Sequence, residues 1–341
     1  MEYISGLIWK EETKVVIGID IGTTQSAVSC GLLEHGMDVK KALHSVSEWP
    51  GQATKGSKIP TAIYYDSSSK PMAFGAETTL YENEDRALDE KWELAKEFKL
   101  ILHPDELKVG SISNINGLPY GVSLEQVYTD FLKYLFKHTE KFFKDRIIQG
   151  TLLWSRYRSN MEFIIAHPNA WGSREQAFLR KVATQAGLVN SNNASKNVRF
   201  VTEAEASVHY CLYYSNLLNH LKIGTNFAVC DAGGSTVDTT LYSVTATSPM
   251  FKVEEKRAPG CVQAGAIFVD QAVRDHMEAT FRRAEGFNKE KDMHMYCNNG
   301  VRDFEAHVKR LFRNDVDGNI NFSGGSPWPY DFTKSVGEVF L

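Results

Sequence analysis

Two aspartates stand out because each ends a β-rich run and precedes a turn that contains glycine. The two segments read Asp20-Ile21-Gly22-Thr23-Thr24 and Asp231-Ala232-Gly233-Gly234-Ser235-Thr236. Glycine has no Cβ, so the backbone can come close to a ligand, and turn amides with neighbouring hydroxyls then point at one place. Each segment is therefore typical of a turn that binds phosphate.

An aspartate at the mouth of such a turn repels phosphate and is better suited to a cation. We expect Asp20 and Asp231 to hold Mg²⁺ through water, between their carboxylates and the phosphate oxygens. Two such turns suit a diphosphate or triphosphate held from both sides. The alternative is that each segment is only a tight hairpin, since Asp-x-Gly is common in turns.

The elements that must position these residues are two β-hairpins, one around each aspartate. In each copy an apolar, β-branched run leads into the turn and a second β-rich run follows it. The copies lie more than half the chain apart, which indicates a duplicated unit rather than a short-period repeat. We expect an α/β protein with two lobes that face each other.

Three helices are predicted between the hairpins. Ser123 and Gln126 match a capping box that opens an amphipathic helix. The same pattern, with Ser173 as the N-cap, opens a second helix that Gly187 ends. A third helix is expected over about residues 203–221.

The remaining pattern predicts strands and loops. The runs 61–65 and 162–166 are typical of strands, because they are short, apolar and rich in β-formers. The polar stretches 189–197 and 285–299 predict exposed loops.

Composition narrows the class of protein. The 341 residues predict about two domains, and 38 Lys and Arg against 42 Asp and Glu leave no basic surface for nucleic acid. Five cysteines without a C-x-x-C pair favour a reducing compartment. No signal peptide and no apolar run of membrane-spanning length is evident, so we expect a cytoplasmic or nuclear protein.

The two aspartate segments resemble the phosphate-binding motifs of the actin-like ATPase superfamily, and in detail those of the 70-kDa heat-shock chaperones. Further stretches are similar in the same order, at 58–65, 164–171, 173–187, 201–207, 260–270 and 305–310. Trp171 and the run 97–103 most resemble the divergent heat-shock protein 12 branch. The resemblance covers nearly all of the chain and implies a duplicated, two-lobed α/β fold of the ribonuclease H-like kind.

The resemblance also implies a role for each matched residue. Asp20 and Asp231 take the magnesium and attacking-water positions, Glu203 orients the hydrolytic water, and Lys99 contacts phosphate. Nucleotide-binding positions are Gly22, Thr23, Thr24, Gly233, Gly234, Ser235, Thr236, Gly265, Lys309 and Arg310.

Plainer interpretations stay open for the residues outside the turns. Glu203 is equally typical of the first turn of any helix, where the dipole favours an acid. Lys99 is also consistent with a solvated helix lysine, and the pair Lys309-Arg310 with a solvated helix face.

The chain departs from the family pattern in two places. Ala204 follows Glu203 where typical members have proline, which puts the usual allosteric coupling through that proline in doubt. Late in the second lobe the adenosine-binding glycine pair is missing, because Gly324-Gly325 comes too early and leads into Ser-Pro-Trp-Pro. We therefore expect an N-terminal tail at 1–12, a first lobe at 13–222 and an incomplete second lobe at 223–341.

The expected function is that of a chaperone-type nucleotide-binding domain that binds ATP or ADP with Mg²⁺ and couples hydrolysis to lobe closure. Hydrolysis is expected only if nucleotide binding survives the missing motif. Expected partners are the nucleotide and co-chaperones or client proteins, with no nucleic acid and no membrane. Two alternatives stay open: a non-catalytic truncated paralogue that acts through protein contacts, and a sugar or metabolite kinase on the same fold.

Overall fold

The computed structural model describes residues 8–104, 117–215, 217, 220–247, 251–283 and 290–309. Its chain divides into two compact units, Met1–Gln263 and Ala264–Leu341. Both aspartate segments lie in the first unit. The expected lobe boundary near residue 222 stays a prediction.

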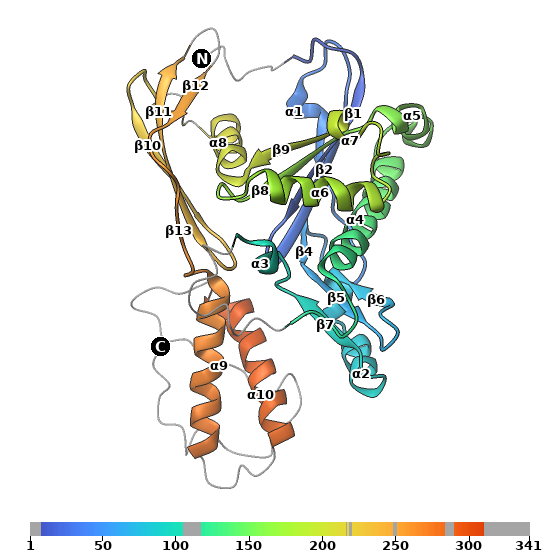
Figure 1. The fold of residues 1–341 in the computed structure, drawn as a ribbon, viewed down its shortest axis with the longest axis vertical. Helices are drawn as coiled ribbons and strands as arrows, with labels where there is room; N and C mark the ends of the chain where they lie inside the picture. Colours follow the sequence, from blue (N-terminus) through green and yellow to red (C-terminus); the bar gives the residue numbers. More distant parts are fainter. Residues whose placement is uncertain are drawn as a thin grey trace. The chain divides into compact units, whose positions relative to one another are not determined.

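The first unit is built around a mixed sheet of six strands (Figure 1). Its path is β3-β2-β1-β8-β9, and β4 pairs with β2 beyond the end of β3. The strands β1, β8 and β9 are parallel, whereas β2 is antiparallel to β1. The six strands are β1 (Lys14–Ile21), β2 (Gln25–Leu33), β3 (Leu43–Ser45), β4 (Lys58–Pro60), β8 (Glu162–His167) and β9 (Val198–Thr202).

The main core lies between one face of this sheet and three helices. Alternate residues of β1 from Val15 to Ile21 point into it, as the period of two in a strand requires. They pack against the apolar faces of α4, α5 and α6, which lie beside the sheet in Figure 1. The helices of this region are α1 (Val39–Ala42), α4 (Leu124–Arg146), α5 (Gly150–Tyr157), α6 (Ser173–Gln185) and α7 (Ala194–Asn197).

Two smaller sheets complete the first unit. One is β6-β5-β7, and in the sequence α2 precedes β7 and α3 follows it. The other is β10-β11-β12, in which β13 also pairs with β11, and it packs against α8. The strands are β5 (Ala62–Tyr65), β6 (Pro71–Phe74), β7 (Glu93–Lys96), β10 (Asn226–Ala232), β11 (Val237–Ala246), β12 (Lys252–Glu255) and β13 (Gly260–Val262). The helices are α2 (Tyr81–Asp89), α3 (Lys99–Leu102) and α8 (Glu203–Tyr214).

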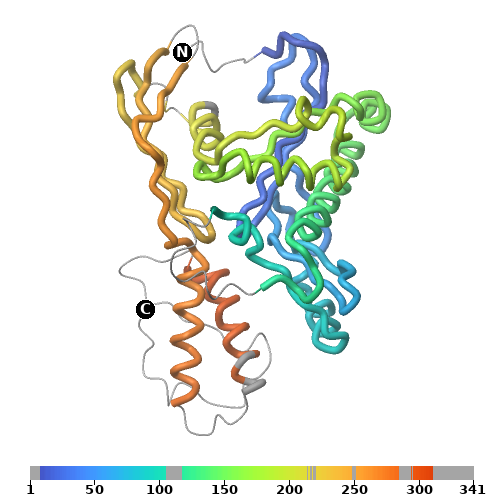
Figure 2. Tube along the Cα trace, viewed as in Figure 1, coloured from blue at the N-terminus to red at the C-terminus, as the bar shows by residue number. Residues whose placement is uncertain are grey.

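The second unit consists of α9 (Ala266–Arg283), α10 (Glu290–Asp303) and a π-helical turn, Phe304–Val308. The two helices run side by side in the tube trace (Figure 2). Met277 and Phe281 of α9 pack on Met293 and Cys297 of α10, so the pair has an apolar core of its own.

Several expected elements are confirmed. Both aspartate segments are β-hairpins, and the expected strands at 61–65 and 162–166 are β5 and β8. Ser123 caps α4, because its hydroxyl accepts a hydrogen bond from the amide of Gln126 at 3.1 Å. Gly187 follows α6 with a φ of 76°, which lets glycine end the helix in the left-handed region.

Other expectations are wrong in their bounds. The N-cap of α6 is Gly172 rather than Ser173, because the Glu175 carboxylate accepts the Gly172 amide at 2.9 Å. The third helix, α8, ends at Tyr214 instead of continuing to about residue 221.

The two predicted loops also contain helix. Within 285–299 the described part belongs to α10, since Met293 and Cys297 recur at helical spacing and are buried against α9. Within 189–197, the short helix α7 buries Ala194 and Asn197. Both stretches are polar overall, and their few buried residues gave too weak a pattern to predict a helix.

We predict that Gly22→Ala destabilises the first hairpin. A Cβ at Gly22 would lie 2.3 Å from the carbonyl oxygen of Gln25, so the turn backbone must shift. We expect a loss of about 1 to 3 kcal/mol in the free energy of unfolding, measured with urea. The matched control is Gly117→Ala, where a Cβ meets nothing within 4 Å. Equal stability of the two variants would contradict this interpretation of the turn.

Candidate functional site

The candidate site lies at the carboxyl ends of the three parallel strands of the first sheet. Asp20 is near the end of β1, the loop Pro168–Trp171 follows β8, and Glu203 follows β9 as the first residue of α8. The carboxyl ends of parallel strands are the usual binding edge of α/β sheets. Three residues or segments from distant parts of the sequence are thus brought to one edge.

The two aspartate hairpins have the same register. Asp20 pairs with Ala27 and Asp231 pairs with Asp238, so each aspartate lies opposite the residue seven positions later. Inside each turn a glycine amide donates to the carbonyl three residues on, from Gly22 at 3.1 Å and from Gly233 at 2.8 Å. The two segments that are similar in sequence are therefore also similar in backbone geometry.

The two turns contact each other directly. The hydroxyls of Thr23 and Ser235 lie 2.9 Å apart and are hydrogen-bonded, and both residues are buried. A Cβ at Gly234 would lie 2.4 Å from Oγ1 of Thr24, so only glycine fits against the first turn. The first hairpin is in turn fixed to the strand region after β4, where the amide of Thr61 donates to the carbonyl of Thr24 at 2.9 Å.

Lys99 and Glu203 form an ion pair beside the turns. Lys99 Nζ donates to Glu203 Oε1 at 2.6 Å, and the lysine is only 5% exposed. The ammonium also lies 5.8 Å from the ring centroid of Trp171, in the loop after β8. Lys99 is therefore not the solvated helix lysine of the plainer interpretation, because its charge is held inside the protein by a carboxylate and an indole.

Charges of both signs converge on the two aspartates. Burial raises the pKa of Asp20, and the charges of Glu203 and Asp231 raise it further, while Lys99 and Lys58 lower it. Burial also raises the pKa of Asp231, with additional contributions from Glu203 and Asp238, and the same two lysines lower it. Four carboxylates and two ammonium groups thus act on one another here.

This set of groups suits a hydrated cation beside phosphate. Within the described ranges, no three acidic, histidine or cysteine side chains are close enough to hold a metal ion directly. Carboxylates that destabilise one another in a partly buried place gain from a nearby divalent cation, and Mg²⁺ commonly keeps several of its waters. The residues present therefore fit Mg²⁺ held through water.

Three residues at the site were missed from the sequence. Asp238 accepts a hydrogen bond from the hydroxyl of Thr236 at 2.7 Å and lies opposite Asp231. Cys261 of β13 lies opposite Asp238; burial, together with a hydrogen bond to Asp238, raises the pKa of its thiol to about 12. Lys58 of β4 acts on both aspartates. The seven-residue spacing within the hairpin could have indicated Asp238, but Lys58 and Cys261 come from strands whose pairing has no sequence signal.

The other predicted nucleotide contacts belong to the second unit. Gly265 is buried just before α9. Lys309 Nζ bonds both carboxylate oxygens of Asp270, at 2.7 and 2.8 Å, and the carbonyl of Ala266 at 3.1 Å. Arg310 lies outside the described residues. Contact of these three residues with a nucleotide stays a prediction.

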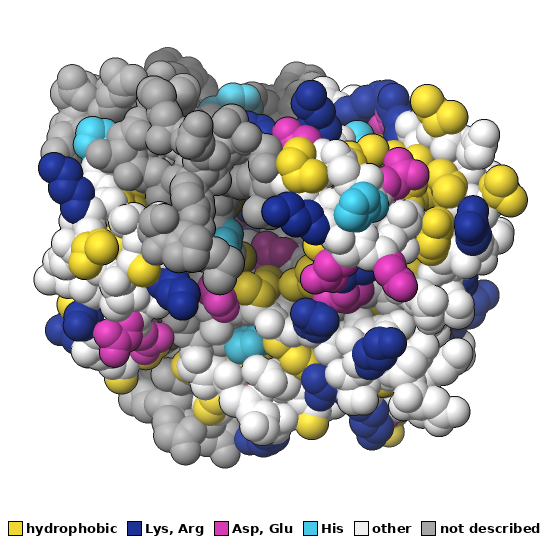
Figure 3. Space-filling model, turned by 90° about the horizontal axis from the view of Figure 1, so that it is seen from above, with side chains coloured by type: hydrophobic (Ala, Val, Ile, Leu, Met, Phe, Trp, Pro, Cys, Tyr) yellow, Lys and Arg dark blue, Asp and Glu magenta, His cyan; other side chains and the backbone are white. Residues whose placement is uncertain are grey.

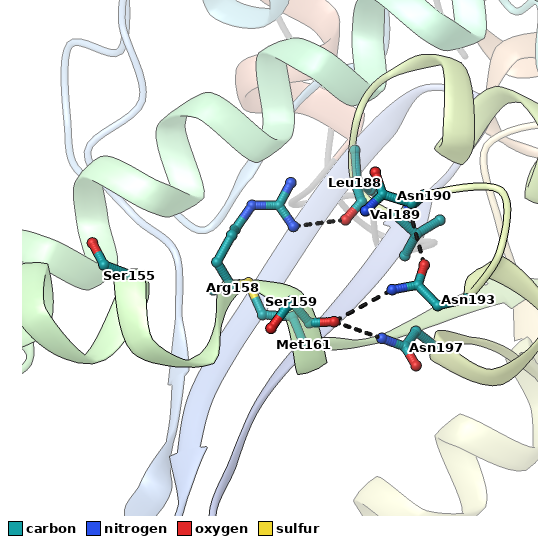
Figure 4. A pocket seen from close by; sticks show the side chains of 9 residues that line it. All are labelled: Ser155, Arg158, Ser159, Met161, Leu188, Val189, Asn190, Asn193 and Asn197. Carbon is teal, nitrogen blue, oxygen red and sulfur yellow. Dashed lines mark hydrogen bonds between the residues drawn. The ribbon is translucent and has the colours of Figure 1, made fainter.

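A separate cavity of about 370 Å³ lies at the other end of β8 (Figure 4). Three of its polar side chains already have partners: the Arg158 guanidinium donates to the carbonyl of Leu188, and the amides of Asn193 and Asn197 donate to the carbonyl of Ser159. Because the amino end of β8 lies here, this cavity is not part of the candidate site.

Fold and site together are compatible with an actin-like ATPase fold: a mixed α/β sheet with two aspartate hairpins. No protein-family model matches the chain. The chain is 26% identical over 202 residues to heat shock 70 kDa protein 12A of Mus musculus and of Homo sapiens. It is 24% identical over 205 residues to human heat shock 70 kDa protein 12B.

The matched residues make up 58% of this chain, and the chain spans 28% of the length of these relatives. The matched part of the chain is thus similar to 70-kDa heat-shock proteins of the heat-shock protein 12 branch. Among the described helices, none is long and apolar enough to cross a membrane.

We predict that Asp20→Asn stabilises the fold at neutral pH. Burial raises the folded-state pKa of Asp20 above its ordinary value of 3.8, so the wild-type protein loses stability as pH rises through the folded pKa. The asparagine variant has no charge to bury. Its free energy of unfolding should exceed that of the wild type at about pH 7, and the difference should shrink towards about pH 4.

Urea unfolding across this pH range measures the effect, with Asp89→Asn on the exposed surface of α2 as the matched control. A difference that does not change with pH would contradict the assignment of a buried charge to Asp20.

Proposed function

We propose that this chain contains a magnesium-dependent nucleotide-binding site of the heat-shock ATPase kind, in which the two aspartate hairpins hold the phosphates from opposite sides. The observation that carries the proposal is the shared register of the two hairpins, whose turns meet beside the Lys99–Glu203 ion pair. A relationship to the heat-shock protein 12 branch supports it. Chaperone activity, lobe duplication and lobe closure are part of the same proposal.

Each group has a defined task in this proposal. The amides and hydroxyls of the two turns bind phosphate oxygens, and Asp20 and Asp231 hold the hydrated cation. Magnesium, when bound, supplies the positive charge that neutralises the phosphates. Glu203 orients the attacking water, and its hydrogen bond to Lys99 at 2.6 Å fixes the direction of the carboxylate.

Phosphate binding between the turns requires the Thr23–Ser235 hydrogen bond to open. The two hydroxyls now lie 2.9 Å apart and satisfy each other, whereas two hydroxyls that share a phosphate oxygen lie farther apart. The ligand therefore exchanges one buried hydrogen bond for two stronger ones to an anion. This exchange couples ligand binding to the distance between the hairpins.

The surface charge is consistent with a small-molecule ligand rather than nucleic acid. The chain has 38 Lys and Arg against 42 Asp and Glu, and the face shown in Figure 3 carries described side chains of both signs. A nucleic-acid interface needs clustered basic residues.

The test of the proposal is calorimetric titration of MgADP and MgATP into the wild-type chain and into Asp231→Asn. The substitution keeps the shape of the side chain and removes the charge that holds the cation, so affinity should fall by about a hundredfold. With EDTA in place of Mg²⁺, the variant should lose this disadvantage and bind at least as well as the wild type, because a carboxylate without its cation only repels the phosphates. The control is Asp145→Asn on the exposed end of α4, which should bind as the wild type does. Absence of saturable binding to the wild-type chain would overturn the proposal.

A milder loss is expected for Thr23→Val. Valine keeps the volume of the buried side chain and removes one hydrogen bond, so binding of MgADP should weaken by about fivefold, equivalent to about 1 kcal/mol. The same titration measures this loss, and a thermal melt without nucleotide provides the comparison. If the melting temperature falls and the affinity for MgADP does not, Thr23 has only a structural role.

A further inference from the structure

Lys58 lies in one cross-strand row with Asp20. Lys58 of β4 is opposite Ala27 of β2, and Ala27 is opposite Asp20 of β1. Residues directly opposite in antiparallel strands project on the same face of the sheet, and adjacent strands are about 4.8 Å apart. The Lys58 and Asp20 backbones are thus about 10 Å apart on one face, with only a methyl group between the side chains. A lysine side chain can span much of this distance.

The position of Lys58 is fixed by bonds on both sides. Its carbonyl accepts the side-chain amide of Gln52 at 2.9 Å, which anchors the start of β4. After β4, the hydroxyl of Thr61 bonds that of Ser26 at 2.7 Å in the interior. The strand that carries Lys58 is therefore attached firmly to the first aspartate hairpin.

The two lysines of the site are in opposite situations. Lys99 is buried and its ammonium is bonded to Glu203. Lys58 is exposed, and within the described part of the chain its ammonium forms no ion pair. Its charge nevertheless acts on Asp20 and on Asp231, which belong to different hairpins. Lys58 thus lies on the sheet face that carries Asp20, with hydrogen-bond donors free for a ligand.

We propose that Lys58 binds the outermost phosphate of the nucleotide held between the hairpins, and that it favours triphosphate over diphosphate. The proposal rests on the proposed function. Lys99 is buried beside the turns, whereas Lys58 lies on β4, which is paired only with β2 at the edge of the sheet. The exposed ammonium of Lys58 at this edge meets the phosphate that extends farthest from the Lys99–Glu203 ion pair. A third phosphate adds the negative charge that this ammonium neutralises.

The test compares MgATP with MgADP in calorimetric titrations of the full chain and three variants. Lys58→Met should weaken MgATP binding by about tenfold and MgADP binding by less than about twofold. Lys58→Arg keeps the charge and should restore most of the affinity for MgATP. Lys41→Met, on the exposed surface of α1, is the matched control and should change neither affinity. The loss in Lys58→Met should also shrink as salt rises, because the group is exposed.

The outcomes separate this inference from the proposed function. If the wild-type chain binds both nucleotides and Lys58→Met binds them as the wild type does, the Lys58 assignment is wrong and the proposed function stands. An equal loss for both nucleotides overturns the assignment to the outermost phosphate. If the wild-type chain binds neither nucleotide, both proposals fall. A thermal melt of each variant checks that the fold is intact.

Discussion

The hydrogen bond between Thr23 and Ser235 depends on a constraint that both aspartate hairpins obey. Each turn is closed by a glycine amide that donates to the carbonyl three residues later, and each aspartate pairs with the residue seven positions on. This register brings the hydroxyl-bearing tips of both turns to one place, while each aspartate stays one residue before the end of its strand. Gly234 allows the tips to meet, because any Cβ there would overlap Thr24.

The charges around the turns explain why such a site costs stability. Burial and neighbouring carboxylates raise the pKa of both Asp20 and Asp231, so the folded chain keeps two aspartates in an environment that disfavours their ionised forms. Proteins retain unfavourable charge mainly where a ligand uses it. Lys99, held between Glu203 and Trp171, limits the cost on the inner side. A divalent cation would remove much of the rest.

Much of this arrangement could be predicted from the sequence, and the reasons for success and failure are physical. Both hairpins are predictable because turn chemistry is local, and Asp20, Asp231, Lys99 and Glu203 come together as the resemblance implies. Lys58 and Cys261 were missed because they reach the site through strand pairing between distant segments. The helix α10 was predicted as a loop because most of its residues are polar, whereas the burial of Met293 and Cys297 against α9 depends on tertiary packing.

The central claim is that two hairpins, more than half the chain apart in sequence, form one phosphate-binding site. Amide hydrogen exchange with and without saturating MgADP tests this most directly, because turn amides that bind phosphate become protected from solvent. The account predicts that MgADP slows exchange at residues 23–24 and 234–236 together, with the same nucleotide midpoint, and only when Mg²⁺ is present, because the amides of Gly22 and Gly233 are already bonded inside their turns. Protection of one turn alone, or of neither, would contradict it.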